Sequence, residues 1–315
     1  FAGNYDSDAD TDDGSCTDYP DDGNYSLGFD GDDHVSVPYS NQLNSFADAV
    51  SISAWIKVTG GEGDYRTILE NGNVEGFALM LGPNEKFYAT IQNQTGWTTV
   101  DGTTIVDLNT WYNVAVTHTP NSIKIYVNGE VDGETTGSFG DIINNDGELF
   151  IGRYHEYENY FIGNIDEVSL WDIALTQEEI QTSMFTDSTI YQPDLVAQWK
   201  FNANDGGTLF DHSGNQNHGT INGATWDGEG FTRPNTSVTF AVNMRDYIES
   251  EGDSLYDGVY IAGGNIGAEN PDDSLFMGHQ MYDHDGNGIY DVTLDLERNT
   301  HYTYCLLYTS DAADE

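Results

Sequence analysis

Apolar and polar residues alternate along several short stretches of this chain. In residues 50–58 the apolar positions Val50, Ile52, Ala54, Ile56 and Val58 alternate with Ser51, Ser53, Trp55 and Lys57. Residues 113–117 and 123–127 show the same period of two. This period predicts β-strands that bury one face.

The turn residues between these stretches are typical of an all-β protein. Residues 123–127 end at Asn128-Gly129, a dipeptide that tolerates positive φ at both turn centres and therefore predicts a hairpin. Many short strands separated by Gly- and Asn-rich turns favour a β-sandwich. One helix is expected, with Thr176 and Glu179 as a capping box and an end near Met184.

Six motifs follow one another over residues 25–175. They are Phe29-Asp30-Gly31-Asp32-Asp33-His34-Val35, Ile52-Ser53-Ala54-Trp55-Ile56, Trp111-Tyr112-Asn113-Val114-Ala115-Val116-Thr117, Ile125-Tyr126-Val127-Asn128-Gly129, Ile151-Gly152-Arg153 and Gly163-Asn164-Ile165-Asp166-Glu167-Val168-Ser169-Leu170-Trp171. In this order and spacing they resemble the laminin-G/pentraxin-like group of concanavalin-A-type jelly rolls. The resemblance implies a jelly roll over residues 21–185 that serves as a glycan-binding module, with calcium dependence as an option.

The segment that follows this jelly roll is expected either to pack on it or to be separate from it. Residues 186–232 resemble the opening of another laminin-G-like unit, but no second Phe-Asp-Gly strand follows. The segment is therefore expected either to pack back as an edge strand and loop or to act as a spacer. His212 and His218 lie in its Gly/Asn-rich part and are interpreted as turn residues rather than metal ligands.

Residues 233–304 alternate again in three stretches and resemble immunoglobulin-like, starch-binding-type sandwiches of secreted bacterial proteins. We expect this second β-sandwich to be incomplete. Residues 305–315 resemble the translation of a sequencing-library adapter and are set aside from the fold expectation.

Residues 1–20 form an acidic segment that contains Cys16. The stretch from Asn4 to Cys16 resembles the end of a short repeat in surface proteins of gliding bacteria. That resemblance implies a disulfide to a cysteine ahead of this chain and a secreted or cell-surface location. An EF-hand is not expected here, because Thr11 and Thr17 stand where that motif needs Gly and Glu.

The charge of the chain narrows the choice of partners. Nine basic and 54 acidic residues give a formal net charge of −45, which repels nucleic acid and anionic membranes. The same charge attracts divalent cations and suits an extracellular protein in a saline setting, or it reflects only a solvated acidic surface. No stretch is apolar over about 18 residues, so no inserted membrane helix is expected.

A calcium site is one hypothesis for the acidic motifs. By alternation Asp166 shares the inward face with Val168 and Leu170, where an isolated carboxylate is costly. The family resemblance implies that the first and last strands lie side by side, which would bring Asp30 and Asp32 to Asp166. The alternative is that Asp166 accepts backbone N–H groups and Asp30 serves a turn.

A second acidic stretch offers another loop of calcium-like spacing. Asp283, Asp285, Asn287 and Asp291 take the first, third, fifth and ninth positions, but the twelfth is Leu294 instead of a bidentate Glu. A Gly/Asp hairpin loop between two strands is the alternative interpretation.

Candidate ligand contacts are the aromatic residues of two loops. Tyr154, Tyr157 and Tyr160 cluster beside Glu156, Glu158 and Asn159, and Trp97 lies in a Gly/Thr-rich stretch. Sugars stack on such rings while polar groups take their hydroxyls, so these four aromatics are predicted to bind glycan. The alternative is that the tyrosines cover their own sandwich edge. Trp55, Trp111 and Trp171 are expected to be packing residues.

Catalysis has no support in the motifs. The paired-carboxylate strand of a concanavalin-type glycosidase, the Gly-x-Ser-x-Gly elbow and the His-Glu-x-x-His helix are all missing from the sequence. Two functions are therefore expected to compete. One is non-catalytic binding of a polysaccharide or glycoconjugate in an exported, adhesive or degradative protein. The other is a structural spacer or a module that binds another surface protein.

Overall fold

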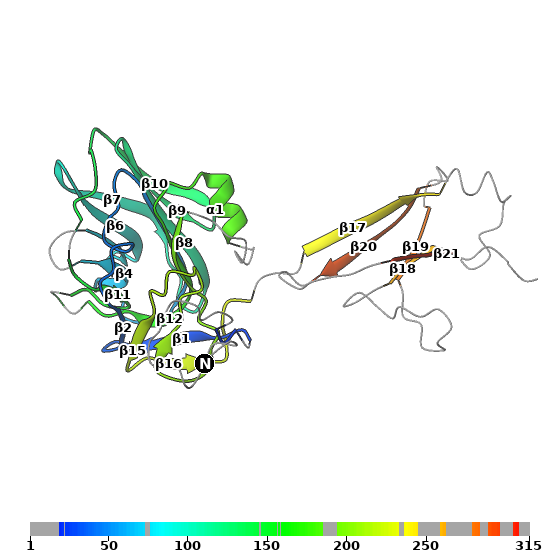
Figure 1. Ribbon diagram of the computed structural model, residues 1–315, viewed down its shortest axis with the longest axis horizontal. Helices are drawn as coiled ribbons and strands as arrows, with labels where there is room; N and C mark the ends of the chain where they lie inside the picture. The colour runs from blue at the N-terminus through cyan, green and yellow to red at the C-terminus, as the bar shows by residue number, and fades with distance from the viewer. Residues whose placement is uncertain are drawn as a thin grey trace, which may run out of the picture. The chain divides into compact units, whose positions relative to one another are not determined.

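The computed structural model describes residues 19–21, 23–72, 76–144, 146–155, 157, 159–184, 194–232, 236–244, 259–262, 279–283, 289–296 and 305–308. The chain divides into two compact units, one up to Thr232 and one beyond it. The expectation of an all-β fold with a jelly-roll sandwich is confirmed, because the first unit consists of two antiparallel sheets that face each other (Figure 1).

The two sheets of the first unit are called sheet A and sheet B. Sheet A contains, in spatial order, β10 (Glu130–Thr136), β9 (Ser122–Val127), β8 (Trp111–Thr119), β3 (Val50–Val58), β12 (Ile162–Trp171), β1 (Ser26–Asp30) and β16 (Thr225–Asp227), and β13 (Leu195–Trp199) also pairs with β12. Sheet B contains β14 (Thr208–Leu209), β15 (Gly219–Asn222), β2 (His34–Val37), β11 (Leu149–Ile151), β4 (Arg66–Asn71), β5 (Phe77–Leu81), β6 (Lys86–Asn93) and β7 (Gly96–Ile105). One large hydrophobic core fills the space between them.

The period-two pattern places its apolar residues in this core. Ile52, Ala54 and Ile56 of β3 are buried between the sheets, as the alternation predicted. The predicted hairpin joins β9 to β10, and Asn128 and Gly129 have φ values of 50° and 79°. Both turn centres are therefore left-handed, which is the geometry that this dipeptide favours.

Helix α1 (Gln177–Ser183) lies against the outer face of sheet A. Thr176 is its N-cap and forms the predicted capping box with Glu179, and Met184 ends it. The buried side chain of Ile180 packs with Ala115 of β8, Tyr126 of β9, Trp171 of β12, Leu195 of β13 and with Leu175, which precedes the helix. Within the described part of the chain, no helix is long and apolar enough to cross a membrane.

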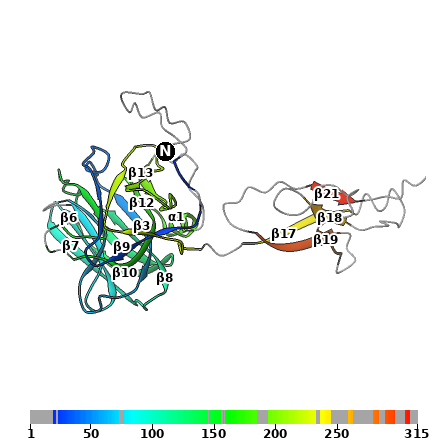
Figure 2. The same cartoon turned by 90° about the horizontal axis from the view of Figure 1, so that it is seen from below.

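The later segment packs on the first sandwich and is not a spacer. β13 pairs with β12, β16 pairs with β1, and β15 pairs with β2, and Figure 2 shows β13 beside β12. A buried carboxylate organises the loop that connects these strands. Asp211 accepts backbone N–H groups from Gln198, Ser213 and Asn217. Such a buried charge is tolerated because it is fully hydrogen-bonded.

His218 belongs to the same loop. Its Nδ1 accepts the backbone N–H of Asp211, and its Nε2 lies 3.1 Å from the Tyr19 hydroxyl. Both ring nitrogens are thus engaged within the protein, which agrees with a turn role for this histidine.

Strand β12 departs from the predicted alternation at one residue. Glu167 has a φ of 50° and forms a bulge, so that two residues of β12 oppose one of β3 between Asp166 and Ser169. Ile165 and Val168 consequently both face the core. Asp166 pairs with Trp55 and lies on the outer face, so the expectation that it shares the inward face with Val168 and Leu170 is wrong.

The described residues of the second unit form two small antiparallel sheets. One pairs β17 (Thr236–Asn243) with β20 (Ile289–Leu296), and the other has the order β19 (His279–Met281), β18 (Val259–Ala262), β21 (Cys305–Tyr308). Met244, Val259, Ile261 and Met281 form its buried cluster. The immunoglobulin-like assignment stays a prediction.

Strand β21 falls inside the segment that was set aside as translated adapter. Residues 305–308 pair with β18 along its whole length. An apolar stretch of four residues can pair with an open strand edge whatever its origin, because the edge presents unpaired N–H and C=O groups. The adapter origin of residues 305–315 stays a prediction. The strand pairing of the second unit extends past the expected boundary at residue 304, to residue 308.

Candidate functional site

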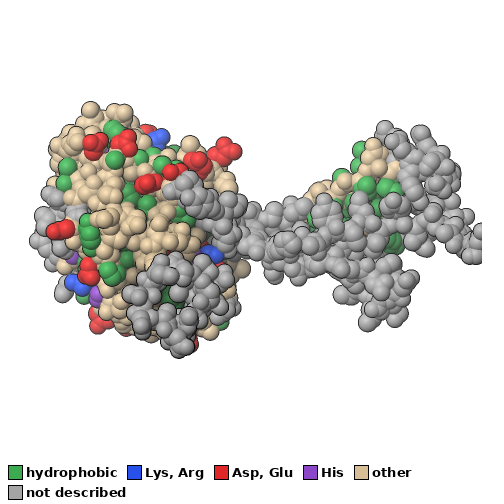
Figure 3. Space-filling model, viewed as in Figure 1, with side chains coloured by type: hydrophobic (Ala, Val, Ile, Leu, Met, Phe, Trp, Pro, Cys, Tyr) green, Lys and Arg blue, Asp and Glu red, His purple; other side chains and the backbone are tan. Residues whose placement is uncertain are grey.

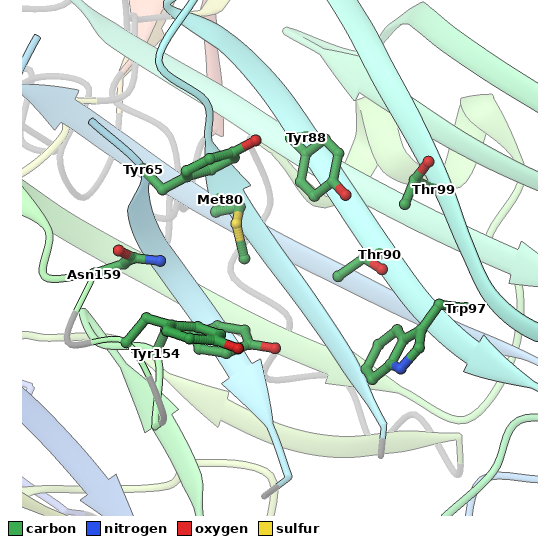
Figure 4. A pocket seen from close by; sticks show the side chains of 9 residues that line it. Tyr65, Met80, Tyr88, Thr90, Trp97, Thr99, Tyr154 and Asn159 are labelled. Atoms are coloured by element: carbon green, nitrogen blue, oxygen red, sulfur yellow. The ribbon is translucent and has the colours of Figure 1, made fainter. Parts of the chain in front are cut away.

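The outer face of sheet B contains a pocket of about 560 Å³. Its lining is aromatic and neutral: Tyr65, Met80, Tyr88, Thr90, Trp97, Thr99, Tyr154, Tyr157 and Asn159. Figure 4 shows Tyr65, Met80 and Tyr154 on one side of the pocket, Trp97 and Thr99 on the other, and Tyr88 and Thr90 between them.

Strand pleating creates the floor of this pocket. In β6, Phe87, Ala89 and Ile91 are buried in the core, so the alternating Tyr88 and Thr90 point outward. The sheet register then brings outward residues of neighbouring strands together. Met80 of β5 pairs with Tyr88, and Thr90 pairs with Thr99 of β7.

One wall is built from the connection between β11 and β12. The Gly152 N–H donates to Ile68 O, and the Asn159 carbonyl accepts the Thr67 N–H, so the chain leaves β4 and returns to it one residue away. Tyr154 and Tyr157 lie between these two contacts and line the pocket, and their rings stack with centroids 5.9 Å apart.

A buried acidic residue of β4 anchors this wall. Glu70 is 4% exposed, and its two carboxylate oxygens bind the backbone N–H and the Nδ1 of His155 at 2.7 and 2.5 Å. Burial raises the pKa of the Glu70 carboxyl, against the opposing effect of its hydrogen bonds to His155. Glu70 therefore fixes the residue next to Tyr154.

The opposite end of β4 positions Tyr65 in a similar way. The Arg66 side chain is 1% exposed and donates to Gly60 O and to Glu85, which also accepts the Gly63 N–H. Burial alone would raise the pKa of Glu85, but the hydrogen bond from Arg66 lowers it. The loop ahead of β4 is thus tied to the β5–β6 turn, and the Tyr65 ring meets Tyr88 edge to face at 6.0 Å.

The lining groups are uncharged at neutral pH. Burial, with the neighbouring Tyr65 and Asp101, raises the pKa of the Tyr88 phenol above its ordinary value of 10.0. The phenol is also hydrogen-bonded to Thr90 and Thr99. The site therefore offers ring faces, hydroxyls and one amide for binding.

The structure brings together three of the four predicted ligand residues. Trp97, Tyr154 and Tyr157 line the pocket, whereas Tyr160 lies 6.5 Å from His34 and 5.9 Å from the Arg153 guanidinium, outside it. Glu156 and Glu158 lie outside the described residues. Tyr65, Met80, Tyr88, Thr90 and Thr99 were missed, although the alternation around Tyr88 and Thr90 marks them as outward-facing.

The comparisons with known proteins agree with this architecture. Residues 29–181 match the Laminin_G_3 family, described as the Concanavalin A-like lectin/glucanases superfamily. This stretch is a concanavalin-A-like domain. The sandwich extends beyond the match, since β13–β16 complete both sheets. No curated protein matches the chain significantly.

Several solved structures resemble the chain. A candidate carbohydrate-binding protein from Bacteroides ovatus shares 24% identity and a TM-score of 0.55, covering 65% of this chain and 59% of its own. The heptameric SAP-like pentraxin of Limulus polyphemus shares 16% identity, with a TM-score of 0.41 over 50% of this chain and 81% of its own. The sialyllactose-bound CBM40 of Ruminococcus gnavus IT-sialidase shares 16%, with a TM-score of 0.41 over 50% and 96%.

An acidic cluster of the concanavalin-A-like domain lies at the turn between β1 and β2. Carboxylate oxygens of Asp30, Asp32 and Asp33 lie within 4.8 Å of one another. Asp33 is 6% exposed and accepts the Asp30 N–H. Burial and the charges of Asp30 and Asp32 raise the pKa of Asp33, although that hydrogen bond opposes the shift. Clustered carboxylate oxygens are the hard donors that calcium prefers. Calcium binding at this turn stays a prediction.

Asp166 does not join this cluster. Asp30 pairs with Ile162, and Asp166 lies four positions further along β12, about 13 Å away at the strand rise. The Asp166 carboxylate instead accepts the Phe231 N–H at 2.8 Å. The predicted set of Asp30, Asp32 and Asp166 is therefore divided, and the alternative in which Asp166 binds a backbone N–H describes its position.

The second predicted calcium loop is only partly described. Tyr282 and Asp291 form an antiparallel bridge with backbone hydrogen bonds in both directions. This bridge lies between the end of β19 and the third residue of β20, and Asp283 follows Tyr282 directly. Asp285 and Asn287 lie outside the described residues, so calcium binding there stays a prediction.

Sheet A also carries aromatic residues on its outer face, but the chain covers them. Phe231 stacks on Trp55 and meets Trp111 edge to face at 6.2 Å. The Lys57 ammonium lies 5.2 Å from the Trp111 ring and 3.8 Å from Glu229. Trp55, Trp111 and Trp171 thus have packing contacts, in line with the expectation for these tryptophans.

Proposed function

We propose that the first unit is a non-catalytic carbohydrate-binding module, which attaches an exported protein to a polysaccharide or glycoconjugate. The observation that carries this proposal is the aromatic pocket of sheet B. Pyranose rings present C–H faces that stack on Tyr and Trp rings, and their hydroxyls are bound by Thr, Tyr and Asn groups. The pocket supplies both kinds of group on one open surface.

The exposure of the pocket aromatics supports the same proposal. Trp97 is 47% exposed, Tyr157 68% and Tyr65 43%. Large apolar side chains that stay exposed beside one another are typical of interaction sites rather than of ordinary surface. The superfamily includes lectins and glucanases, so its fold is compatible with glycan ligands.

A glycan array tests this function. We expect the full chain to bind a restricted set of glycans equally well with calcium and with chelator, because the acidic cluster is at the β1–β2 turn and the strand residues of the pocket come from β5, β6 and β7. Absence of binding in both conditions, from protein with a cooperative unfolding transition, would favour the spacer or protein-binding alternative.

A further inference from the structure

The charge around the pocket indicates the class of glycan. None of its nine lining residues is a Lys, Arg, His, Asp or Glu, within the described part of the chain. An anionic sugar carries a carboxylate or sulfate, and proteins bind these groups with Arg or Lys, most tightly through paired N–H donors. The lining offers no such cation.

Two arginines that are adjacent in sequence to lining residues are committed elsewhere. Arg66 is buried and bound to Glu85 and Gly60 O, and the Arg153 guanidinium lies over the Phe150 and Tyr160 rings. Figure 3 shows Asp and Glu side chains spread over the visible face of the first unit and few Lys or Arg. With a formal net charge of −45, the protein repels anionic ligands before contact.

The pocket is also wider than one sugar ring. Met80 of β5 and Trp97 of β7 are two strands apart, about 10 Å at the usual strand spacing. Tyr154 lies opposite Trp97 across the pocket, and its ring stacks with that of Tyr157. Two separate stacking surfaces thus face one pocket, and its 560 Å³ lies within the ~300–1,000 Å³ of small-molecule sites.

We propose that this pocket binds an uncharged oligosaccharide segment, with one ring against Trp97 and another against the Tyr154–Tyr157 pair, and that it discriminates against uronate, sialate and sulfate groups. The inference rests on the proposed carbohydrate-binding function. It adds the electrostatic class of the ligand and its minimum length.

Matched pairs of glycans test the charge discrimination. Titration calorimetry of the full chain would compare methyl-esterified with de-esterified homogalacturonan oligosaccharides, lactose with sialyllactose, and neutral with sulfated galactan oligosaccharides. Cello-, xylo-, manno- and laminari-oligosaccharides of two to six units, with the corresponding monosaccharides, complete the panel. We expect binding only among neutral members, at least tenfold tighter than any charged partner, and tighter for longer members than for monosaccharides.

The outcomes separate the two proposals. A charged member that binds more tightly than its neutral partner overturns the present inference and leaves carbohydrate binding intact. Equal affinity for a monosaccharide and a longer oligosaccharide overturns the two-ring arrangement. Failure of every glycan to bind overturns carbohydrate binding itself, and this inference with it.

A charge-introducing variant gives a second readout. Thr99 is exposed on the pocket wall, so Thr99→Lys places a cation there without disturbing the core. We expect a gain of about tenfold for the charged partner of a bound neutral glycan, at low salt, from one charge-assisted contact. Thr99→Gln is the uncharged control. No gain with Thr99→Lys would overturn the conclusion that missing cations exclude anionic glycans.

Discussion

On sheet A, the Trp55 and Trp111 rings of the outer face are packed against the chain's own Phe231, whose N–H also binds Asp166. On sheet B, Tyr65, Trp97 and Tyr157 surround a pocket and remain 43–68% exposed. The two faces carry similar residues, so residue type alone does not distinguish a packing surface from a binding surface. The distinction comes from whether the same chain supplies the partner ring.

The largest effect is expected from uncovering sheet A. Phe231→Ala removes the ring that contacts Trp55 and Trp111 and should lower the free energy of unfolding of the first unit by about 3 kcal/mol. Urea unfolding followed by tryptophan fluorescence measures this, and Phe231→Leu should recover part of the loss. Glycan affinity should not change; new binding at Trp55 would show that the covered face is itself a ligand site.

On sheet B, Trp97→Ala removes a pocket ring that is already exposed. Affinity for a bound glycan should fall about 30-fold, or about 2 kcal/mol, because one stacking surface is lost. The unfolding midpoint should stay the same. Tyr39→Ala, an equally exposed aromatic outside the pocket, is the control, and an equal loss there would contradict a localised site.

Glu70, which anchors the wall of the pocket, allows the effect of positioning a ligand-binding ring to be compared with the effect of removing one. Glu70→Gln keeps the shape but weakens the bond to His155, so affinity should fall about tenfold through a less ordered Tyr154–Tyr157 wall. Calorimetry should show a more unfavourable binding entropy. Glu148→Gln, exposed just before β11, serves as control; unchanged binding by Glu70→Gln would mean that the wall is held without this side-chain contact.

Acid should affect stability and binding differently. His118 is fully buried, and burial lowers its pKa below the ordinary 6.5, against the opposing effect of Asp48. The unfolded chain therefore binds the proton more readily, so stability should decline as pH falls below 6.5, and less in His118→Gln. Pocket affinity should stay flat from pH 6.5 to 9, since its described lining is neutral. Identical pH profiles for the two proteins would exclude His118 as the source.

Calcium should produce the smallest change. At about five times its dissociation constant it would add about 1 kcal/mol to the stability of the first unit by mass action. Asp33→Asn should abolish this gain and Asp166→Asn should keep it, because Asp166 lies away from the acidic cluster. Thermal unfolding with calcium, magnesium or chelator measures the effect. A gain that survives Asp33→Asn would move the site elsewhere.

Local sequence patterns sufficed to predict the strands, the turn and the helix, but not which side chains these elements bring together. The alternation around Ile52 and Ile56, the Asn128-Gly129 turn and the Thr176 cap act over a few residues, and the structure confirms them. The bulge at Glu167 reversed the side of Asp166, and no glycine or other turn residue marked it. A single inserted residue is enough to invert the facing of a strand.

The pocket shows the same limit from another side. Trp97 and Tyr154 were accessible to prediction because aromatics in polar loops stand out. Met80, Tyr88 and Thr90 become part of the site only through the register of β5, β6 and β7. Strand neighbourhood depends on pairings between distant residues, which a single sequence does not specify.

The late strands of the first unit have a consequence for how it is made. β1 lies between β12 and β16, so Leu27 finds partners at both Ile165 and Trp226. A ribosome must therefore release about 200 further residues before the edge next to Leu27 is closed. Until then β1 and β2 expose backbone groups to other nascent chains, and closure requires a slow, distant pairing. Formation of the native sandwich thus depends on what protects β1 and β2, the first strands to be synthesised, until β16 has been made.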